Sequence, residues 1–347
     1  MIVKNESDVL ARCLNSCKNA FDEIIIVDTG STDNTKQIAQ KFNCKIFDFV
    51  WQDDFSLARN FAFSQAKSDY IMWLDADDVI PKSTLLKIKA LKNTFSADVY
   101  MLKYNVAFLN GKPTFSFYRE RILKNCPSAK WQGAVHECIA PFGKVEHVNC
   151  AINHKKQKQG DSNRNINIYK KIEKQRELNA REQYYYAREL FEHKCYSKCA
   201  KVLSKFLAGN KGWVENVIDA HVLLADCYAM LNKPDKILPQ LFNTFAYDSP
   251  RANVLCKIGD YHLKHGEFER AINWYTLAPK CKDVLCKGGF VDRAYYNYYP
   301  YVQMCYCYYC LKDIKSAIKY NAMAKKFNNS QIVQNNEKYF NSLGAFK

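Results

Sequence analysis

The spacing of hydrophobic positions changes along the chain and divides it into two kinds of sequence. In the first quarter, segments of helical spacing separate short apolar runs at Met1–Val3, Ile24–Val27, Cys44–Val50 and Tyr70–Leu74. Short apolar runs that alternate with helices predict buried, mostly parallel strands with helices on both faces of the sheet. We therefore expect an α/β domain at the N-terminus.

An antiparallel part follows this first pattern. Val99–Leu109 and Thr114–Leu123 have the composition of strands and are joined by Asn110-Gly111, a hairpin signal. Val148–Ile152 is expected to be the last strand of the domain. The polar run Lys155–Asn163 after it is interpreted as a mobile loop or a linker.

The second half of the chain has helical spacing throughout and contains a recurring corner between paired helices. Successive corners end 38, 34 and 46 residues apart, so they resemble a degenerate 34-residue tetratricopeptide repeat. Stacked helical pairs form a concave surface suited to peptides. The segment Tyr295–Tyr309 is dense in tyrosine; we prefer repeat core as its explanation over an exposed interface. The corners are Tyr196–Cys199, Pro234–Ile237, Phe268–Ala271 and Ile314–Ala317.

Composition limits where in the cell the protein is expected and which partners it is expected to have. No apolar run of the 347 residues is long enough to span a membrane, and Met1–Glu6 lacks the features of a signal peptide, so we expect a cytoplasmic protein. The 15 cysteines are then expected to be thiols. For Cys305-x-Cys307-x-x-Cys310, the core of a helix is preferred over a metal knuckle as the interpretation. The net charge of +16 is attributed to a lysine-rich solvated surface, and no nucleic-acid partner is expected.

The candidate chemistry lies where the run Tyr70–Leu74 ends in three acids, Asp75, Asp77 and Asp78. Ligands of α/β sheets bind beyond the carboxyl ends of the strands, and crowded carboxylates are relieved by a divalent cation such as Mg²⁺ together with substrate phosphate. An isolated Asp-x-Asp is more often a solvated turn. The surrounding pattern favours a metal–diphosphate site.

Other polar residues follow the neighbouring strands. Asp28 ends a strand before the turn Thr29–Asp33, where it is placed to hydrogen-bond a base or ribose. Arg59, early in the next helix, either points toward a nucleotide or braces the Asp75 strand, with a solvated helix face as an equal alternative. Arg121 either meets phosphate or is a surface arginine of its strand. Glycine-rich dinucleotide and P-loop motifs are absent from the sequence.

Five ordered motifs resemble family 2 glycosyltransferases of the GT-A fold. Within that family they resemble the branch with a tetratricopeptide-type helical tail, which includes the sublancin-type peptide S-glycosyltransferases. The resemblance implies a GT-A nucleotide-diphospho-sugar transferase domain over 1–160, a linking helix over 161–181 and a helical-repeat domain over 182–347. It also implies a few further residues before the first strand in related chains, so we expect that strand to be incomplete. The motifs are Ile2–Glu6, Ile26–Asp33, Asp54–Asn60, Trp73–Asp77 and Trp131–Glu137.

The resemblance also implies roles for residues on the donor side. Asn5 and Glu6 line the nucleotide pocket, and Asp28 contacts the uracil or ribose. Asp77 is the more direct metal ligand, while Asp75 reaches the ribose or a metal-bound water. The remaining contacts that we expect on this side are Arg59 to the nucleotide and His154 to the metal or diphosphate.

On the acceptor side, Glu137, with His136 as the weaker candidate, lies where the family places the acceptor base. We therefore expect a Mg²⁺- or Mn²⁺-dependent inverting transferase that moves a sugar from a UDP-sugar to a peptide or protein side chain. Two alternatives stay open: transfer to a cell-surface glycan or lipid carrier, and a non-catalytic helical-repeat scaffold with a degenerate transferase domain. The helical tail is expected to bind the acceptor, form a homodimer or cover the catalytic domain.

Overall fold

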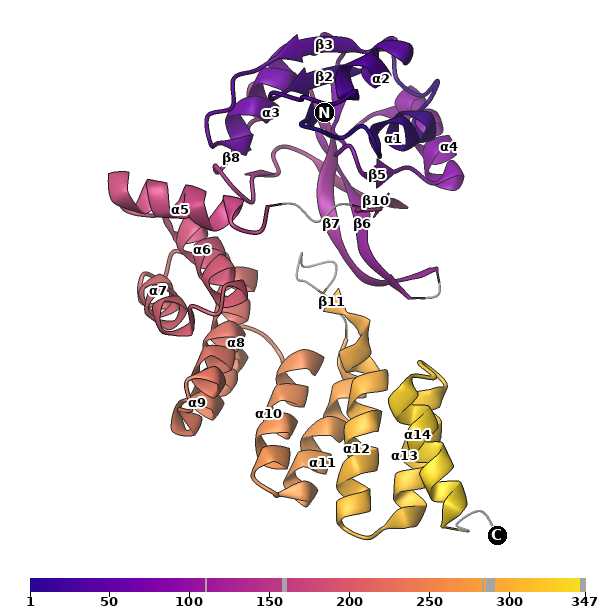
Figure 1. The fold of residues 1–347 in the computed structure, drawn as a ribbon, viewed down its shortest axis with the longest axis vertical. Coiled ribbons are helices and arrows are strands. Elements are labelled where there is room, and N and C mark those ends of the chain that lie inside the picture. Colours follow the sequence, from indigo (N-terminus) through magenta and orange to yellow (C-terminus); the bar gives the residue numbers. More distant parts are fainter. Residues whose placement is uncertain (110, 158–160, 283, 285–290, 344–347) are drawn as a thin grey trace. The chain divides into compact units, whose positions relative to one another are not determined.

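The protein was examined as a computed structural model, which describes residues 1–347 except 110, 158–160, 283, 285–290 and 344–347. It divides into two compact units, Met1–Leu178 and Asn179–Lys347 (Figure 1). The predicted fold class, a GT-A-like α/β domain followed by an all-helical domain, is confirmed by this architecture. Asn110 of the predicted hairpin turn and residues 158–160 of the predicted linker lie outside the described residues.

The N-terminal unit begins with alternating strands and helices and continues with longer strands. Its elements are β1 (Ile2–Val3), α1 (Leu10–Ser16), β2 (Ile25–Asp28), α2 (Thr35–Lys41), β3 (Lys45–Asp48), α3 (Phe55–Ser64), β4 (Tyr70–Met72), β5 (Asp78–Val79), α4 (Lys82–Leu91), η1 (Lys92–Thr94), β6 (Val99–Leu109), β7 (Lys112–Lys124), β8 (Trp131–Gln132), β9 (Cys138–Ile139), β10 (Val145–His154) and α5 (Arg164–Gln175).

A parallel sheet of order β1-β2-β3 carries helices on both of its faces. Successive side chains of a strand point to opposite faces, so the contacts of two neighbouring residues of β3 show what covers each face of the sheet. Ile46 packs with Leu10 and Leu14 of α1 and with Ala39 of α2. The next residue, Phe47, places its ring 6.3 Å from that of Phe61 in α3. The predicted two-sided covering of the sheet is therefore confirmed for these strands.

The longer strands form a second sheet of order β7-β6-β10-β5 within this unit, with β4 beside β7. β6 and β7 pair antiparallel, which confirms the predicted hairpin strands. The expectation of a parallel strand at Tyr70–Leu74 is wrong, because β4 pairs antiparallel with β7. β10 pairs with β5 in a register that sets His154 opposite Asp78. This register positions the candidate site.

A cavity lies beside strands of both sheets. It has a volume of about 390 Å³ and is lined by Met1 and Ile25 on one side and by Tyr70 and Met72 on the other. No pairing between β1 and β4 is recorded among the described strands. The described strands therefore form separate sheets at this point, although the alternating pattern of strands and helices predicts a continuous one.

The C-terminal unit is built from paired helices. Its elements are α6 (Ala180–Glu192), α7 (Tyr196–Ala208), α8 (Val214–Met230), η2 (Pro234–Lys236), α9 (Ile237–Asn243), η3 (Thr244–Ala246), α10 (Ala252–Lys264), α11 (Phe268–Leu277), η4 (Ala278–Lys280), β11 (Val291–Asp292), η6 (Arg293–Tyr296), α12 (Tyr298–Cys310), α13 (Ile314–Lys325) and α14 (Gln331–Ser342).

Every predicted corner lies at the start of the second helix of a pair. α7, α11 and α13 begin at the first residue of their corners, and η2 begins at Pro234 ahead of α9. Each corner is preceded by one residue of positive φ: Lys194, Asn232, Gly266 and Lys312. The same left-handed turn therefore recurs in all four pairs. It explains how a weak sequence repeat still folds into regular helical pairs.

The tyrosine-rich and cysteine-rich helix α12 contributes mainly to the core of the helical unit. Cys305 and Cys307 are buried, and Tyr299, Tyr301 and Tyr308 pack against buried residues of α10 and α11. Within the described residues, the cysteines of α12 belong to no cluster of three metal-ligating side chains. The interpretation of this segment as repeat core therefore describes it better than a metal knuckle does.

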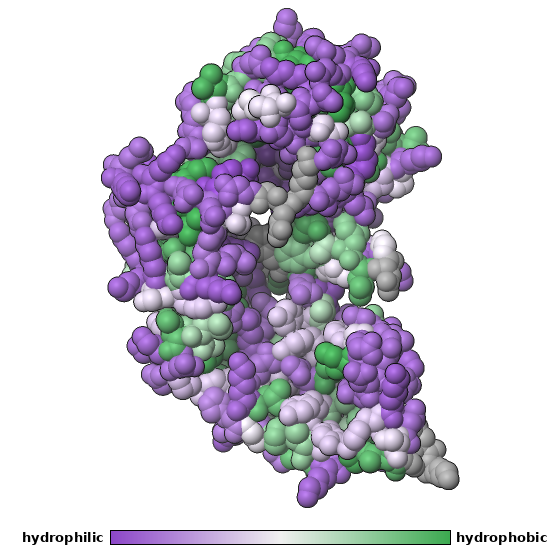
Figure 2. Space-filling model, viewed as in Figure 1, coloured by the Kyte–Doolittle hydropathy of each residue, from purple (hydrophilic) through white to green (hydrophobic). Residues whose placement is uncertain are grey.

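The surface is largely hydrophilic, and Figure 2 shows polar residues over most of the visible face. This is the arrangement expected of a lysine-rich solvated surface in a chain of net charge +16. None of the described helices combines the length and the apolar composition needed to cross a membrane.

Candidate active site

The acidic run follows β4 and ends at Asp78, the first residue of β5, and its members have different surroundings. Asp78 is completely buried. It accepts hydrogen bonds from Arg121 Nη1 at 2.9 Å, from the Tyr104 hydroxyl at 2.8 Å and from the backbone N–H of Asp75 at 3.0 Å. A buried carboxylate needs this degree of compensation. Asp78 therefore serves first to fix the turn that presents Asp75 and Asp77.

Both interpretations of Arg121 are wrong, because this side chain is fully buried beneath the acidic run. Its guanidinium lies 3.7 Å from the ring centroid of Trp73 and 4.2 Å from that of Tyr104. Ring faces attract cations, and Asp78 supplies the opposite charge. The hydrophobic neighbours Ile122 and Leu123 gave no signal that an arginine of this strand faces the core.

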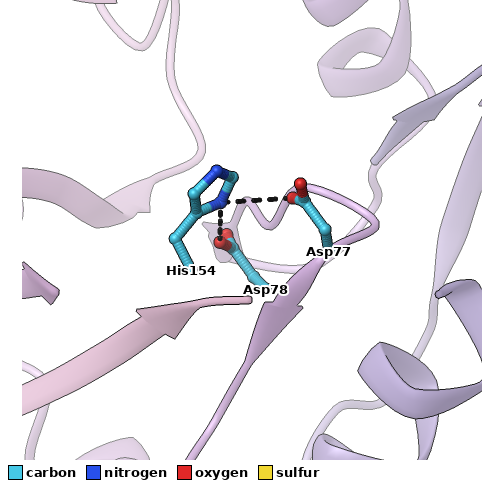
Figure 3. Close-up of side chains that lie close together, drawn as sticks. All are labelled: Asp77, Asp78 and His154. Carbon is cyan, nitrogen blue, oxygen red and sulfur yellow. Dashed lines mark ion pairs between the residues drawn. The ribbon is translucent and has the colours of Figure 1, made fainter. Parts of the chain in front are cut away.

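Asp77, Asp78 and His154 converge on one point (Figure 3). His154 Nδ1 lies 3.3 Å from Asp77 Oδ1, 3.5 Å from Asp78 Oδ1 and 2.7 Å from the Tyr104 hydroxyl. Burial alone would lower the pKa of His154, but its hydrogen bonds to the two aspartates raise it to about 9. The pairing of β10 with β5 brings His154 there across more than seventy residues of sequence.

This group has donor atoms that suit a divalent cation. One ligand atom from each of the three residues lies within 4.8 Å of the others. Two carboxylates and an imidazole fit Mn²⁺, and carboxylates with substrate phosphate fit Mg²⁺. Asp78 is already engaged by Arg121 and Tyr104, so Asp77 is the more available carboxylate. His154 would bind a cation only in its neutral form. Asp75 lies outside this group, and its predicted metal contact stays a prediction.

Asp75 is joined to Glu137 through Arg59. Arg59 Nη2 donates to Asp75 Oδ1 at 2.7 Å, and Arg59 Nε donates to Glu137 Oε1 at 2.6 Å. Burial on its own raises the pKa of Asp75, but the positive charges of Arg59 and Arg121 hold it below its ordinary value. The structure thus supports the bracing alternative for Arg59. Its contact with a nucleotide stays a prediction.

Helix α3 also holds the segment that carries Glu137. Asp54 caps the helix by accepting from the backbone N–H of Leu57. The Asn60 side chain donates to the backbone C=O of Trp131 at 3.0 Å and accepts from its N–H at 2.8 Å. The motif Asp54–Asn60 therefore has a local structural explanation, which is to attach α3 to β8, the strand that precedes the loop.

The predicted acceptor bases lie in that loop. The Glu137 side chain is 12% exposed and paired with Arg59. His136 has a φ of 52°, and its ring lies nearly parallel to that of Tyr169 at 6.5 Å. Glu137 joins the hydrogen-bonded cluster of Arg59 and Asp75. Its choice over His136 as the base is supported by this contact and stays a prediction.

The predicted nucleotide residues lie together at the carboxyl ends of β1 and β2. Asp28 Oδ1 accepts from the N–H groups of Gly30 and Ser31 at 2.9 and 2.8 Å. Asn5 Oδ1 accepts from the N–H of Thr32 at 2.7 Å, and the N–H of Glu6 donates to Thr35. Asp28 Oδ2 is buried and has no hydrogen-bond partner within the described structure. Such an orphaned carboxylate oxygen is suited to a ligand donor.

Comparison with known proteins places this geometry in a family. Residues 1–142 match the family model described as "Glycosyl transferase family 2". These residues form a family 2 glycosyl transferase domain. The matched range includes Glu137 and the acidic run, whereas His154 lies beyond it. The resemblance based on the five motifs is confirmed by this match.

Two curated relatives are similar in sequence to parts of this chain. A TPR repeat-containing protein of Synechococcus elongatus is 33% identical over 139 residues, which cover 40% of this chain and 34% of the relative. The glycosyltransferase SunS of Bacillus subtilis, derived from the SPbeta prophage, is 29% identical over 257 residues, covering 67% and 58%. The chain thus spans about a third and somewhat over half of the length of these relatives.

The chain also resembles a solved structure, that of S. aureus TarS 1–349 in complex with UDP-GlcNAc. It is 16% identical and aligns with a TM-score of 0.42 over 71% of this chain and 89% of the other.

Sequence reasoning missed two members of the site. The sequence places Asp78 among the three acids that a cation would relieve but gives it no role as a ligand, and it does not single out Tyr104. Tyr104 links Asp78 to His154 through its hydroxyl. Its place as the third acid of a run that follows a buried strand is a signal that could have found Asp78. Nothing in the spacing of β6 distinguishes Tyr104.

Proposed function

We propose that this protein is a metal-dependent, inverting glycosyltransferase that takes its sugar from a nucleotide sugar, most simply a UDP-sugar. The observation that carries the proposal is the hydrogen-bonded chain Asp75–Arg59–Glu137 in a family 2 domain. It joins an acidic run with metal-ligating geometry to a carboxylate that can act as a base. A degenerate domain would have no need of this arrangement.

The donor side is formed by the acidic run and the ends of the first strands. Asp77 and His154 would hold a divalent cation, with Asp78 close by. The cation, when bound, supplies Lewis acidity for the leaving diphosphate. Asp28 would accept from the uracil or ribose through its unpartnered Oδ2, and Asn5 and Glu6 shape the adjoining loop.

The acceptor side is formed by the loop that carries Glu137. Its carboxylate would take the proton of the acceptor O–H or S–H, while the acceptor atom forms a bond to the anomeric carbon. The bond between that carbon and the diphosphate oxygen breaks, and UDP leaves with the electron pair. A single displacement of this kind inverts the anomeric configuration.

The acceptor is proposed to be a peptide or protein side chain. Four helical pairs with the same left-handed turn support this proposal, because stacked pairs present extended surfaces that suit chain-like ligands. A thiol acceptor would demand less of Glu137 than a hydroxyl, because a thiol is the stronger acid.

Donor hydrolysis tests the proposed reaction without knowledge of the acceptor. Purified protein is incubated with UDP-glucose, UDP-galactose, UDP-N-acetylglucosamine and GDP-mannose, with Mg²⁺ or Mn²⁺ and then with EDTA. Slow release of the nucleoside diphosphate from one donor, abolished by EDTA, is expected. Release that is unaffected by EDTA would overturn metal dependence. The absence of both release and binding for every donor would favour the scaffold alternative.

A further inference from the structure

Arg59 occupies a position between two carboxylates that come from distant parts of the transferase domain. It projects from α3, whereas Asp75 follows β4 and Glu137 lies between β8 and β9. Its Nε and Nη2 atoms each donate to one oxygen of a different carboxylate, at 2.6 and 2.7 Å. These short distances are typical of charge-assisted hydrogen bonds. The side chain therefore connects the acidic run with the loop of the predicted base.

The guanidinium also contacts two indole rings. Its central carbon lies 5.2 Å from the ring centroid of Trp73 and 4.7 Å from that of Trp131, and the side chain is 10% exposed. The two indole rings contact each other, with centroids 5.0 Å apart and planes at 75°, so the guanidinium rests against both from one side. Held by two rings and two carboxylates, it has little freedom to turn. The spacing of its two donor atoms is set by covalent geometry. The spacing of the two bound carboxylate oxygens is consequently fixed as well.

We propose that Arg59 is a positioning residue that holds Glu137 at a set distance from Asp75, so that the acceptor side and the donor side of the site stay in register. This inference rests on the proposed function, because it assigns the register a role in sugar transfer. Arg59 acts through Glu137 and does not itself take the acceptor proton. Lysine cannot replace it, since an ammonium is a point charge that does not form a planar fork.

Further contacts of α3 support this role. The backbone N–H of Phe55 donates to the C=O of Ala134 at 2.8 Å, and Asn60 makes its two hydrogen bonds to Trp131. The helix is thus attached to the loop on both sides of Gly133. Arg59 is the contact of α3 that extends this attachment to the acidic run.

The helical unit offers a matched control for the test. Arg251 is similarly buried and donates to both oxygens of Glu215 and to Asp248, at 2.7 to 3.1 Å. Arg251→Lys makes the same chemical change in the same kind of cluster, within the other unit. Both lysine variants are expected to lower the thermal midpoint of unfolding, so activity is measured well below it.

The experiment compares UDP release by the full chain, using the donor and metal that the wild type accepts. Arg59→Lys is expected to lower kcat about a hundredfold, the size of effect that follows from misplacing a catalytic group. KM for the donor should change much less. Arg251→Lys should stay within about twofold of the wild type, as expected for a site outside the machinery. The double variant Arg59→Lys/Glu137→Gln should be no slower than Glu137→Gln alone, because Arg59 acts through Glu137.

The outcomes distinguish a failure of the positioning role of Arg59 from a failure of the proposed function. A fully active Arg59→Lys, or a double variant whose losses multiply, would overturn the positioning role while leaving the proposed function intact. Equal losses in kcat for Arg59→Lys and Arg251→Lys would also overturn it, since general destabilisation would then explain both. A wild-type protein that releases no UDP from any donor would overturn the proposed function, and the role of Arg59 in transfer with it.

Discussion

Two buried arginine clusters, one in each unit, use the same groups in different ways. In the helical unit, Arg251 binds both oxygens of Glu215 and adds a contact to Asp248, three residues away in sequence. In the transferase domain, Arg59 binds a single oxygen of Asp75 and a single oxygen of Glu137. Both guanidinium groups are at least nine-tenths buried. The difference lies in how the carboxylates are shared.

An arginine that binds both oxygens of one carboxylate fills its hydrogen-bonding capacity on that side. An arginine that binds one oxygen of each of two carboxylates instead orients both of them. Both oxygens of Glu215 are engaged by one partner, which suits a residue that fixes α8 against the start of α10. Arg59 engages Oε1 of Glu137 and leaves the other oxygen outside this contact. A base must be held in place and still reach its proton. The same chemistry therefore stabilises one unit and, under the proposed function, holds the base of the other.

The most direct way to break this comparison is to neutralise the glutamate of each cluster. Glu137→Gln should reduce UDP release about a thousandfold, within the range for a general base, while donor binding persists. Glu215→Gln should leave the rate within about twofold, because that glutamate lies outside the transferase domain. Rates and donor affinities are measured by UDP release and calorimetry. If release persisted in Glu137→Gln, the assignment of the base would be wrong.

A third buried pair, Asp78 with Arg121, sharpens the comparison because it lies beneath the site. Asp78→Asn leaves the charge of Arg121 buried without its counter-charge, which should cost about 3 kcal/mol of the free energy of unfolding. Urea unfolding, monitored by tryptophan fluorescence, measures this loss of free energy of unfolding, since Trp73 stacks on Arg121. The neighbouring Asp77→Asn, which is partly exposed, should stay within about 0.5 kcal/mol. Equal losses for the two variants would show that Asp78 has no special structural role.

The sequence predicts what depends on local spacing. The strands of the hairpin, the strand before His154 and the four helical corners were all placed correctly, because periodicity and turn residues determine them. It did not predict the antiparallel partner of β4 or the burial of Arg121, which depend on contacts between distant segments. The candidate site divides in the same way. The acidic run is visible in the sequence, whereas the links through Tyr104 and Arg59 depend on tertiary packing.

Removing Asp77 tests the metal cluster, which has no counterpart among the described residues of the helical unit. Asp77→Ala should weaken Mn²⁺-dependent UDP binding by about a hundredfold or more, since even outer contacts of metal sites cost ten- to a hundredfold. Calorimetry with UDP and Mn²⁺ measures the effect. Asp69→Ala removes an exposed acid just before the same strand and should bind UDP as the wild type does. Unchanged binding in Asp77→Ala would place the metal site elsewhere.

The smallest expected effect concerns two glycines of the helical unit and differs in sign between them. Alanine normally stabilises a helical position relative to glycine by up to about 1 kcal/mol. At Gly259, however, a Cβ would lie 2.6 Å from the ring of Tyr275, whose hydroxyl is bound to Asp260 at 2.6 Å. The ring is therefore not free to move aside. Gly259→Ala should cost about 1 kcal/mol net, because overpacking exceeds the gain in propensity.

At Gly209, the C-cap residue that follows α7, the backbone has a helical φ of −73° and the nearest atom to a Cβ is 3.4 Å away. Gly209→Ala should therefore stabilise the protein by about 0.5 kcal/mol. Thermal unfolding of both variants measures the two signs, and UDP release should be unchanged in each. A stabilised Gly259→Ala would mean that α10 and α11 are less closely packed than the structure has them. A fall in UDP release in either variant would instead connect the packing of the helical pairs with the reaction, and the division between a stabilising unit and a reactive one would no longer hold.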